Sequence, residues 1–243
     1  MAVWPYPRWI AHRGAGKLAP ENTLAAFRLG AAHGYTCFEC DVKLSADGQP
    51  FLLHDATLER TSTGQGTAGA LPWAALSRLD AGSWHSTAYA GERLPTLDAI
   101  AQFVLAHGFT LNLEIKPTPG MERTTGEAVG SACLRLWNRK AQAPLFSSFR
   151  PEALLGARST APGIPRALLL DTLWQGWFGV AQELGCAAVV TNFQLMDAAL
   201  LARLRAARLR ALCYTVNDAA SADTLLTLGV DGLITDAVDR LGP

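Results

Sequence analysis

The sequence has no excess of either charge and no long apolar run. Lysine plus arginine number 21, aspartate plus glutamate also number 21, and the formal net charge is +0. A balanced chain has no general affinity for nucleic acid or acidic membranes, so we expect no nucleic-acid partner and only local anion binding. No uninterrupted apolar stretch approaches the length of a membrane span, which argues against stable membrane insertion.

Signals for disulfides, zinc and secretion are also lacking. The five cysteines are odd in number and spread along the chain, which does not suggest a disulfide framework. Cys37 and Cys40 have the C-x-x-C spacing, but in a strand they would face opposite sides, and no second pair completes a zinc site. Met1 to Arg8 has two prolines and no apolar core of signal-peptide length. We therefore expect buried thiols and a cytoplasmic protein.

The sequence also lacks two common catalytic motifs and any segment typical of a linker between domains. The chain has no G-x-S-x-G sequence and no Walker A sequence, so neither a serine nucleophile nor a P-loop is predicted. No composition shift divides the 243 residues, which fit one large domain over 1–243.

What the sequence does have is a regular alternation of strand-like and helix-like segments. Nine segments are strand-like: 9–11, 37–42, 50–53, 111–116, 145–148, 166–170, 187–191, 210–215 and 232–235. Helix-like segments lie between most of them, including one predicted over 122–140. The alternation predicts a parallel sheet closed as a (β/α)8 TIM barrel. One of the nine is then a hairpin partner or lies outside the barrel, and the sequence does not say which.

The alternation is interrupted after the third strand-like segment. Glycine, serine, threonine and alanine dominate around 61–69, and Trp73, Trp84 and Tyr89 are interleaved without long periodicity. This pattern predicts a small insertion at about 57–94, over one end of the domain.

Carboxylates stand inside two apolar strands. In 37–42, the side chains of Glu39 and Asp41 would project from the same face of the strand. Segment 111–116 likewise has a carboxylate, Glu114, inside an apolar strand. Side by side, the carboxylates would repel each other unless a hard divalent cation such as Mg²⁺ or Ca²⁺ bound their oxygens. The alternative is that they pair with surface lysines. Because charges are rarely buried without a partner, we favour a metal site for one divalent cation.

Histidines follow two other strands. His12 comes after the first strand and His54 after the third. A lone histidine at a strand end is usually structural, but two beside a carboxylate pair can act as general base and general acid. Strand ends converge in a barrel, so Arg13 and Lys116 would add positive charge for phosphate oxygens there. The combination predicts metal-assisted phosphoryl chemistry.

A glycine turn offers an alternative function. Residues 14–19 match G-x-G-x-x-A after a strand, with Glu39 a little over twenty positions on, as in nicotinamide-dependent oxidoreductases. That fingerprint needs its helix to begin inside the turn. Pro20 and a cap at Asn22 or Thr23 place the helix start several residues later.

The ordered motifs of the whole chain carry a family resemblance. They are Ala11-His12-Arg13-Gly14, Pro20-Glu21-Asn22-Thr23, Glu39-Cys40-Asp41-Val42, His54-Asp55, Leu113-Glu114-Ile115-Lys116, Ser148-Phe149, Tyr214-Thr215-Val216-Asn217 and Asp231-Gly232. In this order the chain resembles the glycerophosphodiester phosphodiesterase family, of the bacterial cytoplasmic type. The resemblance implies a TIM barrel with a small insertion, acting on a small-molecule glycerophosphodiester. It also implies hydrolysis to glycerol 3-phosphate and an alcohol.

The resemblance also assigns roles, residue by residue. It implies His12 and His54 as the acid/base pair, Glu39, Asp41 and Glu114 as metal ligands, Arg13 and Lys116 as phosphate contacts, and Tyr214 as a substrate contact. The family usually has tryptophan at the position of Tyr214, which keeps a flat face for the glycerol or the leaving group. Glu21 and Asn22 match too, although a first-turn acid and a helix cap explain them equally well.

Two further alternatives stay open at this point. One is cleavage of lipid substrates of the lysophospholipase D type, with Trp174, Trp177 and Phe178 either as an apolar lip or as helix packing. The other is a barrel that binds phosphoesters without catalysis, which the presence of both histidines and all three acids disfavours. The sequence predicts no oligomeric state.

Overall fold

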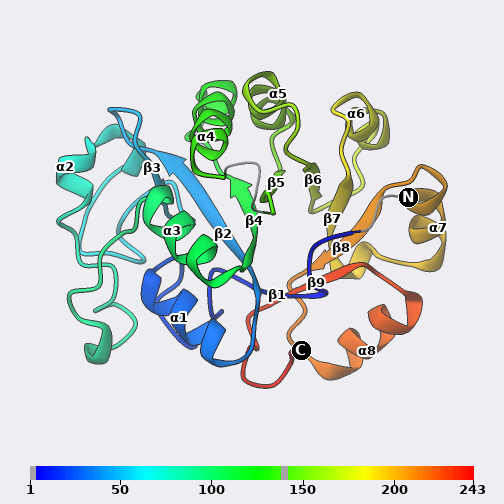
Figure 1. Ribbon diagram of the computed structural model, residues 1–243, viewed down its shortest axis with the longest axis horizontal. Helices are drawn as coiled ribbons and strands as arrows, with labels where there is room; N and C mark the ends of the chain where they lie inside the picture. Colours follow the sequence, from blue (N-terminus) through cyan, green and yellow to red (C-terminus); the bar gives the residue numbers. More distant parts are fainter. Residues whose placement is uncertain (1–3, 138–141) are drawn as a thin grey trace.

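Within residues 4–137 and 142–243, which the computed structural model describes, eight parallel strands form a closed barrel with the helices outside it (Figure 1). The strands are β1 (Trp9–Ala11), β2 (Cys37–Leu44), β4 (Thr110–Ile115), β5 (Leu145–Ser148), β6 (Arg166–Leu170), β7 (Ala188–Asn192), β8 (Arg210–Tyr214) and β9 (Gly232–Thr235). Closure comes from β1, which pairs in parallel with both β9 and β2. The predicted (β/α)8 barrel is confirmed.

The ninth strand of the described chain is β3 (Pro50–Leu52), and it lies outside the parallel barrel. It pairs antiparallel with the end of β2, with Val42 opposite Leu52. The turn after β2 is too short for a crossover, so the chain can only return as a hairpin. The structure thereby answers which of the nine strand-like segments is the hairpin partner.

Apolar side chains fill two layers, one on each side of the barrel wall. Phe38, Cys40 and Val42 of β2 point outward into the layer shared with the helices. Cys37 and Leu145 belong to the layer inside the barrel. Strand side chains alternate between the two layers, so Glu39 and Asp41 point into the barrel. Both predictions for the cysteines hold, since Cys37 and Cys40 are buried on opposite sides of β2.

The helices begin and end at recognisable signals. They are α1 (Leu24–Ala32), α2 (Trp73–Leu76), α3 (Leu97–His107), α4 (Glu122–Leu136), α5 (Pro151–Thr160), α6 (Trp177–Glu183), α7 (Ala198–Ala206) and α8 (Ala219–Leu228). Thr23 caps α1 by accepting from the backbone of Ala26, and Asp197 and Asp218 cap α7 and α8 in the same way. No helix among the described residues is both long and apolar enough to cross a membrane.

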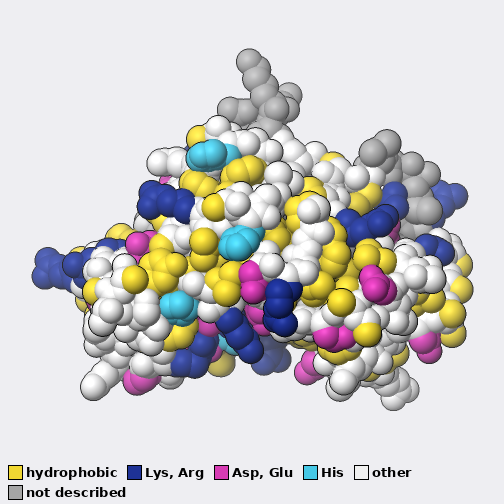
Figure 2. Space-filling model, turned by 90° about the horizontal axis from the view of Figure 1, so that it is seen from below, with side chains coloured by type: hydrophobic (Ala, Val, Ile, Leu, Met, Phe, Trp, Pro, Cys, Tyr) yellow, Lys and Arg dark blue, Asp and Glu magenta, His cyan; other side chains and the backbone are white. Residues whose placement is uncertain are grey.

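Two predictions reach beyond the described residues. The helix predicted over 122–140 ends at Leu136, and residues 138–141 lie outside the described part of the chain. Residues 1–3 of the N-terminal stretch also lie outside it. On the face shown in Figure 2, basic and acidic side chains are interspersed, as the balanced composition predicts.

The segment between β3 and α3 has a small core of its own. It contains η1 (Ala68–Ala70), α2 and η2 (Thr87–Tyr89), and it includes the residues for which an insertion is predicted. Together with Phe51 of β3, its apolar side chains form a separate cluster: Leu53, Leu58, Ala68, Leu76, Ala81 and Leu94. The segment also contacts the first helix, because Glu92 accepts a hydrogen bond of 3.1 Å from the backbone of Ala25.

Candidate active site

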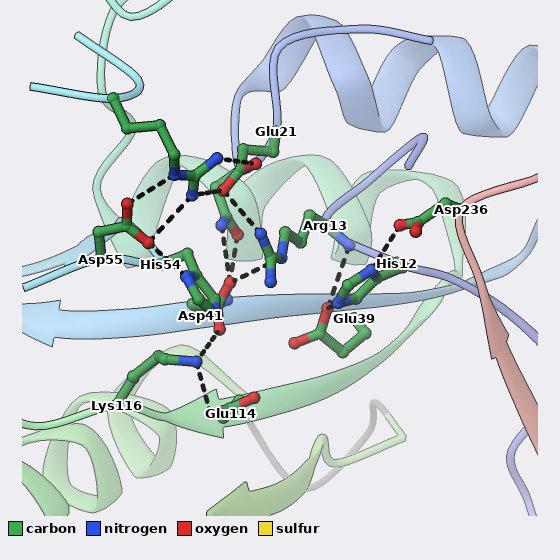
Figure 3. A network of polar contacts seen from close by, with 12 residues as sticks. His12, Arg13, Glu21, Glu39, Asp41, His54, Asp55, Glu114, Lys116 and Asp236 are labelled. Atoms are coloured by element: carbon green, nitrogen blue, oxygen red, sulfur yellow. Dashed lines mark hydrogen bonds and ion pairs between the residues drawn. The ribbon is translucent and has the colours of Figure 1, made fainter. Parts of the chain in front are cut away.

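The predicted site residues meet where the barrel strands end. His12 and Arg13 follow β1, Glu39 and Asp41 point inward from β2, His54 follows β3, Glu114 is on β4, and Lys116 follows it. Figure 3 shows these seven side chains in one polar network. The ends of parallel barrel strands lie at one face, so residues far apart in sequence become neighbours.

Three carboxylates lie at the centre of this network. One oxygen from each of Glu39, Asp41 and Glu114 lies within 4.8 Å of the others, and all three residues are buried. The register of the barrel causes this, since Asp41 of β2 lies beside Glu114 of β4. Among the described residues, Glu39 Oε1 and Asp41 Oδ1 have no hydrogen-bond partner. Three carboxylate oxygens, two of them without a hydrogen-bond partner, fit a hard divalent cation.

The titration of these carboxylates reflects their crowding. Burial, reinforced by the charges of Asp41 and Glu114, raises the pKa of Glu39 well above its usual range. Burial and then Asp41 raise the pKa of Glu114 to about 7. Burial also opposes ionisation of Asp41, but Lys116, Arg13 and His54 together lower its pKa. The cluster is therefore short of positive charge.

Two basic side chains supply part of that charge. Lys116 Nζ lies 3.2 Å from Glu114 Oε1 and 3.4 Å from Asp41 Oδ1. Arg13 Nε lies 3.4 Å from Asp41 Oδ2, and the backbone N–H of Arg13 donates to Glu39 Oε2 at 3.1 Å. The alternative of lysine pairing thus holds in part for Asp41 and Glu114. Among the described residues no lysine forms an ion pair with Glu39.

Each predicted histidine is paired with an aspartate. His12 Nδ1 lies 2.6 Å from Asp236 Oδ1, and its Nε2 lies 3.7 Å from Glu39 Oε2. His54 Nδ1 lies 2.6 Å from Asp55 Oδ1. Burial lowers the pKa of His54, although the charge of Asp41 works in the opposite direction. An aspartate on one ring nitrogen fixes the tautomer and leaves the other nitrogen for proton transfer.

The aspartate partners were missing from the sequence prediction. Asp55 belongs to the His54-Asp55 motif, in which the sequence indicates a role only for the histidine. Asp236 gave a weaker signal, as an acid directly after the last strand. Asn217 holds it, donating from Nδ2 to Asp236 Oδ2 at 3.0 Å and accepting from the Asp236 backbone at 2.8 Å.

Asn22 and Glu21 also belong to this network. The sequence leaves open whether they match the family motif or serve as a helix cap and a first-turn acid, and the contacts favour the first. Thr23 is the cap of α1, whereas Asn22 has φ of 60° and donates to Asp41 Oδ2 at 2.8 Å. Glu21 accepts from Arg13 at 2.9 Å. Neither residue acts as a cap or first-turn acid of α1.

The glycine turn is explained by packing. A Cβ on Gly16 would lie 2.1 Å from the Asp236 carbonyl oxygen, so the β1–α1 loop contacts the end of β9 directly. Gly14 lies against Ala26, and α1 begins only at Leu24. The glycines thus place this loop beside Asp236, with no helix start in the turn to bind a pyrophosphate.

Two cavities open onto the network. A chamber of about 160 Å³ is lined by residues that include His12, Glu39, Asn112 and Tyr214. A larger cavity of about 770 Å³ is lined by residues that include Asp55, Arg150, Asp171 and Trp174. Both are lined by His54, Glu114, Lys116, Phe149 and Leu169. The two cavities therefore meet at these five side chains.

Of the three residues predicted either as an apolar lip or as helix packing, one lies at the cavity and two pack in the helix layer. Trp174 lines the larger cavity and is 37% exposed. Trp177 is buried in the core, and both Trp177 and Phe178 pack against the guanidinium of Arg203. Helix packing thus accounts for Trp177 and Phe178, and only Trp174 reaches the cavity.

Comparison with known proteins decides the family. The model of the glycerophosphoryl diester phosphodiesterase family matches residues 12–240. The chain belongs to this family. A glycerophosphodiester phosphodiesterase of Caldanaerobacter subterraneus is 30% identical over 237 residues, which are 96% of this chain and 95% of that protein.

Solved structures agree with this membership of the phosphodiesterase family. An Oleispira antarctica phosphodiesterase in complex with the product sn-glycerol-3-phosphate has a TM-score of 0.91 at 35% identity, covering 97% of this chain and 95% of that one. A glycerophosphodiester phosphodiesterase of Agrobacterium tumefaciens has a TM-score of 0.82 at 28% identity, covering 96% and 97%. The predicted family, barrel fold and enzyme class are confirmed, whereas the roles of individual residues stay predictions.

Tyr214 is the residue at which this family member departs from the expected motif. Its ring meets Phe149 edge-on, with centroids 5.8 Å apart, at the wall of the small chamber. Its hydroxyl donates to the Leu170 carbonyl at 3.1 Å. The added hydroxyl is thus satisfied by the barrel, and Tyr214 still lines the chamber.

Proposed function

We propose that this phosphodiesterase hydrolyses glycerophosphodiesters to sn-glycerol 3-phosphate and an alcohol by paired-histidine catalysis with one divalent cation. The observation that carries the proposal is the meeting of two histidine–aspartate pairs and three carboxylates where the two cavities join. The product seen in the Oleispira antarctica phosphodiesterase is in keeping with glycerol keeping the phosphate.

Glu39, Asp41 and Glu114 would hold the cation, Mg²⁺ or Ca²⁺. The unpartnered oxygens of Glu39 and Asp41 and the raised pKa values of Glu39 and Glu114 support this, because a cation relieves the repulsion that disfavours three buried carboxylates. When bound, such an ion supplies positive charge to phosphate oxygens. Arg13 and Lys116 would add to that charge as phosphate contacts, since each already lies beside the cluster.

The two cavities suggest how the substrate lies. The small chamber matches a compact group such as glycerol, with Tyr214 as one wall, whereas the larger cavity has room for varied alcohols. The phosphate would lie at the side chains that both cavities share, among them His54 and Lys116. His12, which lines only the small chamber, would then be on the glycerol side of phosphorus.

This placement divides the proton transfers between the histidines. His12 takes the proton from the attacking oxygen, which is water or the 2-hydroxyl of the substrate's glycerol. His54 gives a proton to the oxygen of the departing alcohol. Attack by the tethered hydroxyl has the proximity advantage of an intramolecular reaction and yields a cyclic phosphate that water then opens. On either route the bond from phosphorus to the alcohol oxygen breaks.

Phosphorus NMR of the reaction with glycerophosphocholine tests the proposal. We expect sn-glycerol 3-phosphate with free choline, activity that is lost on chelation, and recovery with Mg²⁺ or Ca²⁺. Phosphocholine with free glycerol would show that the wrong bond was assigned. Full turnover by thoroughly metal-free protein would overturn the cation site.

A second candidate is cleavage of lysophospholipids of the lysophospholipase D type. It is favoured by the exposed Trp174 at the larger cavity, beside Leu173, which is 43% exposed. Choline release from lysophosphatidylcholine, compared with glycerophosphocholine at equal concentration, measures this preference. A faster reaction with the lipid would favour the second candidate.

A further inference from the structure

Arg60 joins two carboxylates that flank the proposed active site. Its Nε and Nη2 donate to the two oxygens of Asp55 at 2.6 and 3.1 Å. Its Nη1 and Nη2 donate to the two oxygens of Glu21, both at 2.8 Å. Figure 3 labels both carboxylates in the network. One guanidinium therefore makes a two-oxygen contact with each acid, the geometry in which arginine binds carboxylates best.

Each of these carboxylates holds a different functional side chain. Asp55 contacts His54 Nδ1 at 2.6 Å, and Glu21 accepts from Arg13 at 2.9 Å. Arg13 and Arg60 even share the same oxygen, Glu21 Oε1. The contacts form one chain from the proposed general acid, His54, to the proposed phosphate contact, Arg13.

We propose that Arg60 is a positioning residue, which keeps His54 and Arg13 in the mutual geometry that phosphodiester cleavage needs. The inference rests on the proposed roles of those two residues. Arg60 itself lines neither cavity of the site, so it acts through Asp55 and Glu21.

The segment between β3 and α3 fixes the place of Arg60. Leu58, two residues earlier, is fully buried in the small core of that segment. Ser62 Oγ donates to the Leu58 carbonyl at 2.7 Å, and Thr61 is buried. The backbone on both sides of Arg60 is therefore held, so the segment acts as a support for the active site.

Stability alone does not explain this arrangement. The Arg60 side chain is 45% exposed, and exposed ion pairs typically contribute little to the free energy of unfolding. A small misplacement of catalytic groups, in contrast, can reduce turnover about a hundredfold. Hydrogen bonds from Arg60 also lower the pKa of Asp55, which keeps that carboxylate charged beside His54. We therefore expect loss of Arg60 to affect turnover far more than folding.

Three variants of the full chain test the proposal, with glycerophosphocholine as substrate. Arg60→Ala should reduce kcat about tenfold to a hundredfold with little change in Tm. Arg60→Lys should recover little, because one ammonium cannot bond four oxygens of two acids. Arg78→Ala is the matched control, since Arg78 is an exposed arginine of the same segment whose guanidinium has no partner among the described residues. It should behave like the parent.

Chemical rescue separates positioning from a general structural role. Millimolar guanidinium should restore part of the kcat of Arg60→Ala and leave the parent and Arg78→Ala unchanged. The proposal is overturned if Arg60→Ala keeps the kcat of the parent, or if its loss follows a lowered Tm and does not respond to guanidinium. Release of sn-glycerol 3-phosphate by the parent tests the proposed function separately, so the two failures are distinguishable.

Discussion

The two histidine–aspartate pairs have the same contact but different supports. The ring-to-carboxylate distance is 2.6 Å for both His12–Asp236 and His54–Asp55. Asp236 follows β9 and is held by Asn217, which follows β8, so the barrel alone builds the first pair. Asp55 is held by Arg60, which belongs to the segment outside the barrel. The barrel thus supplies one of the two proposed proton-transfer groups complete and leaves the other to a peripheral segment.

The two histidine–aspartate pairs also differ in their exposure to solvent, and the pair built by the barrel is the less exposed. The side chains of His12 and Asp236 are 16% and 18% exposed, whereas those of His54 and Asp55 are both 27% exposed. His12 lines only the small chamber and contacts the carboxylate cluster through Glu39, while His54 also lines the larger cavity. The proposed base, which would act on the glycerol side, suits the more enclosed position, and the proposed acid, which would meet varied alcohols, suits the more open one.

Loss of either histidine should give the largest effect. Removal of a proton-transfer group typically costs about a hundredfold to ten-thousandfold. His12→Ala and His54→Ala should therefore each lower kcat on glycerophosphocholine by this range, with little change in Tm. Near-normal turnover in either folded variant would refute its assignment and would leave Lys116 as the next candidate.

A change in the β1–α1 loop should damage the first pair only. A Cβ on Gly16 would meet the Asp236 carbonyl at 2.1 Å, so Gly16→Ala should displace Asp236 from His12 and reduce kcat about tenfold. Gly48→Ala is the control for the cost of a positive φ, because Gly48 has φ of 81° and nothing within 4 Å of its added Cβ.

Both glycine variants should lose stability, and Gly16→Ala should lose more. Denaturant unfolding and steady-state kinetics of the two proteins check this. Equal losses of activity in the two variants would mean that contact with Asp236 is not what matters at Gly16.

The carboxylate cluster should make cation binding weaker at low pH. The pKa of Glu114 is raised to about 7, so below that pH a proton competes with the cation for this carboxylate. Affinity should rise as the pH passes upward through 7, and the proton on Glu114 alone makes it about tenfold weaker at pH 6 than at pH 8. Glu39, whose pKa is also raised, adds to this dependence. Calorimetric titration with Ca²⁺ at both values measures the change, and Glu114→Gln should remove the part that comes from Glu114. A pH-independent affinity in the parent would contradict the ligand assignment.

Much of the fold is predictable from the sequence because the barrel strands are short apolar runs. The predicted bounds of β1, β5, β6 and β9 agree with the structure to the residue. The antiparallel pairing of β3 is not encoded in its own residues, which resemble any other buried strand, but it follows from the short connection to β2, which leaves no room for a crossover. Pairing direction depends on what the chain contacts, which a run of apolar residues does not encode.

The candidate site is predictable only where a polar side chain lies inside an apolar strand or directly after one. His12, Glu39 and Glu114 stand out because polar groups interrupt apolar runs. Asp236 and Arg60 do not, because their role comes from loops that meet across 224 positions for Asp236 and 39 for Arg60. Such supports depend on tertiary packing, so sequence pattern alone does not show them.

The division of roles between the pairs is tested most directly by changing the leaving group. In a glycerophosphodiester of p-nitrophenol, the leaving group departs as p-nitrophenolate and needs no proton. A general acid is therefore dispensable for this substrate. The loss of kcat in His54→Ala should therefore nearly vanish with this substrate, while the loss in His12→Ala should stay as large as with glycerophosphocholine. If both variants keep equal losses on the two substrates, or if His12→Ala is the one that recovers, the account of the two pairs is wrong.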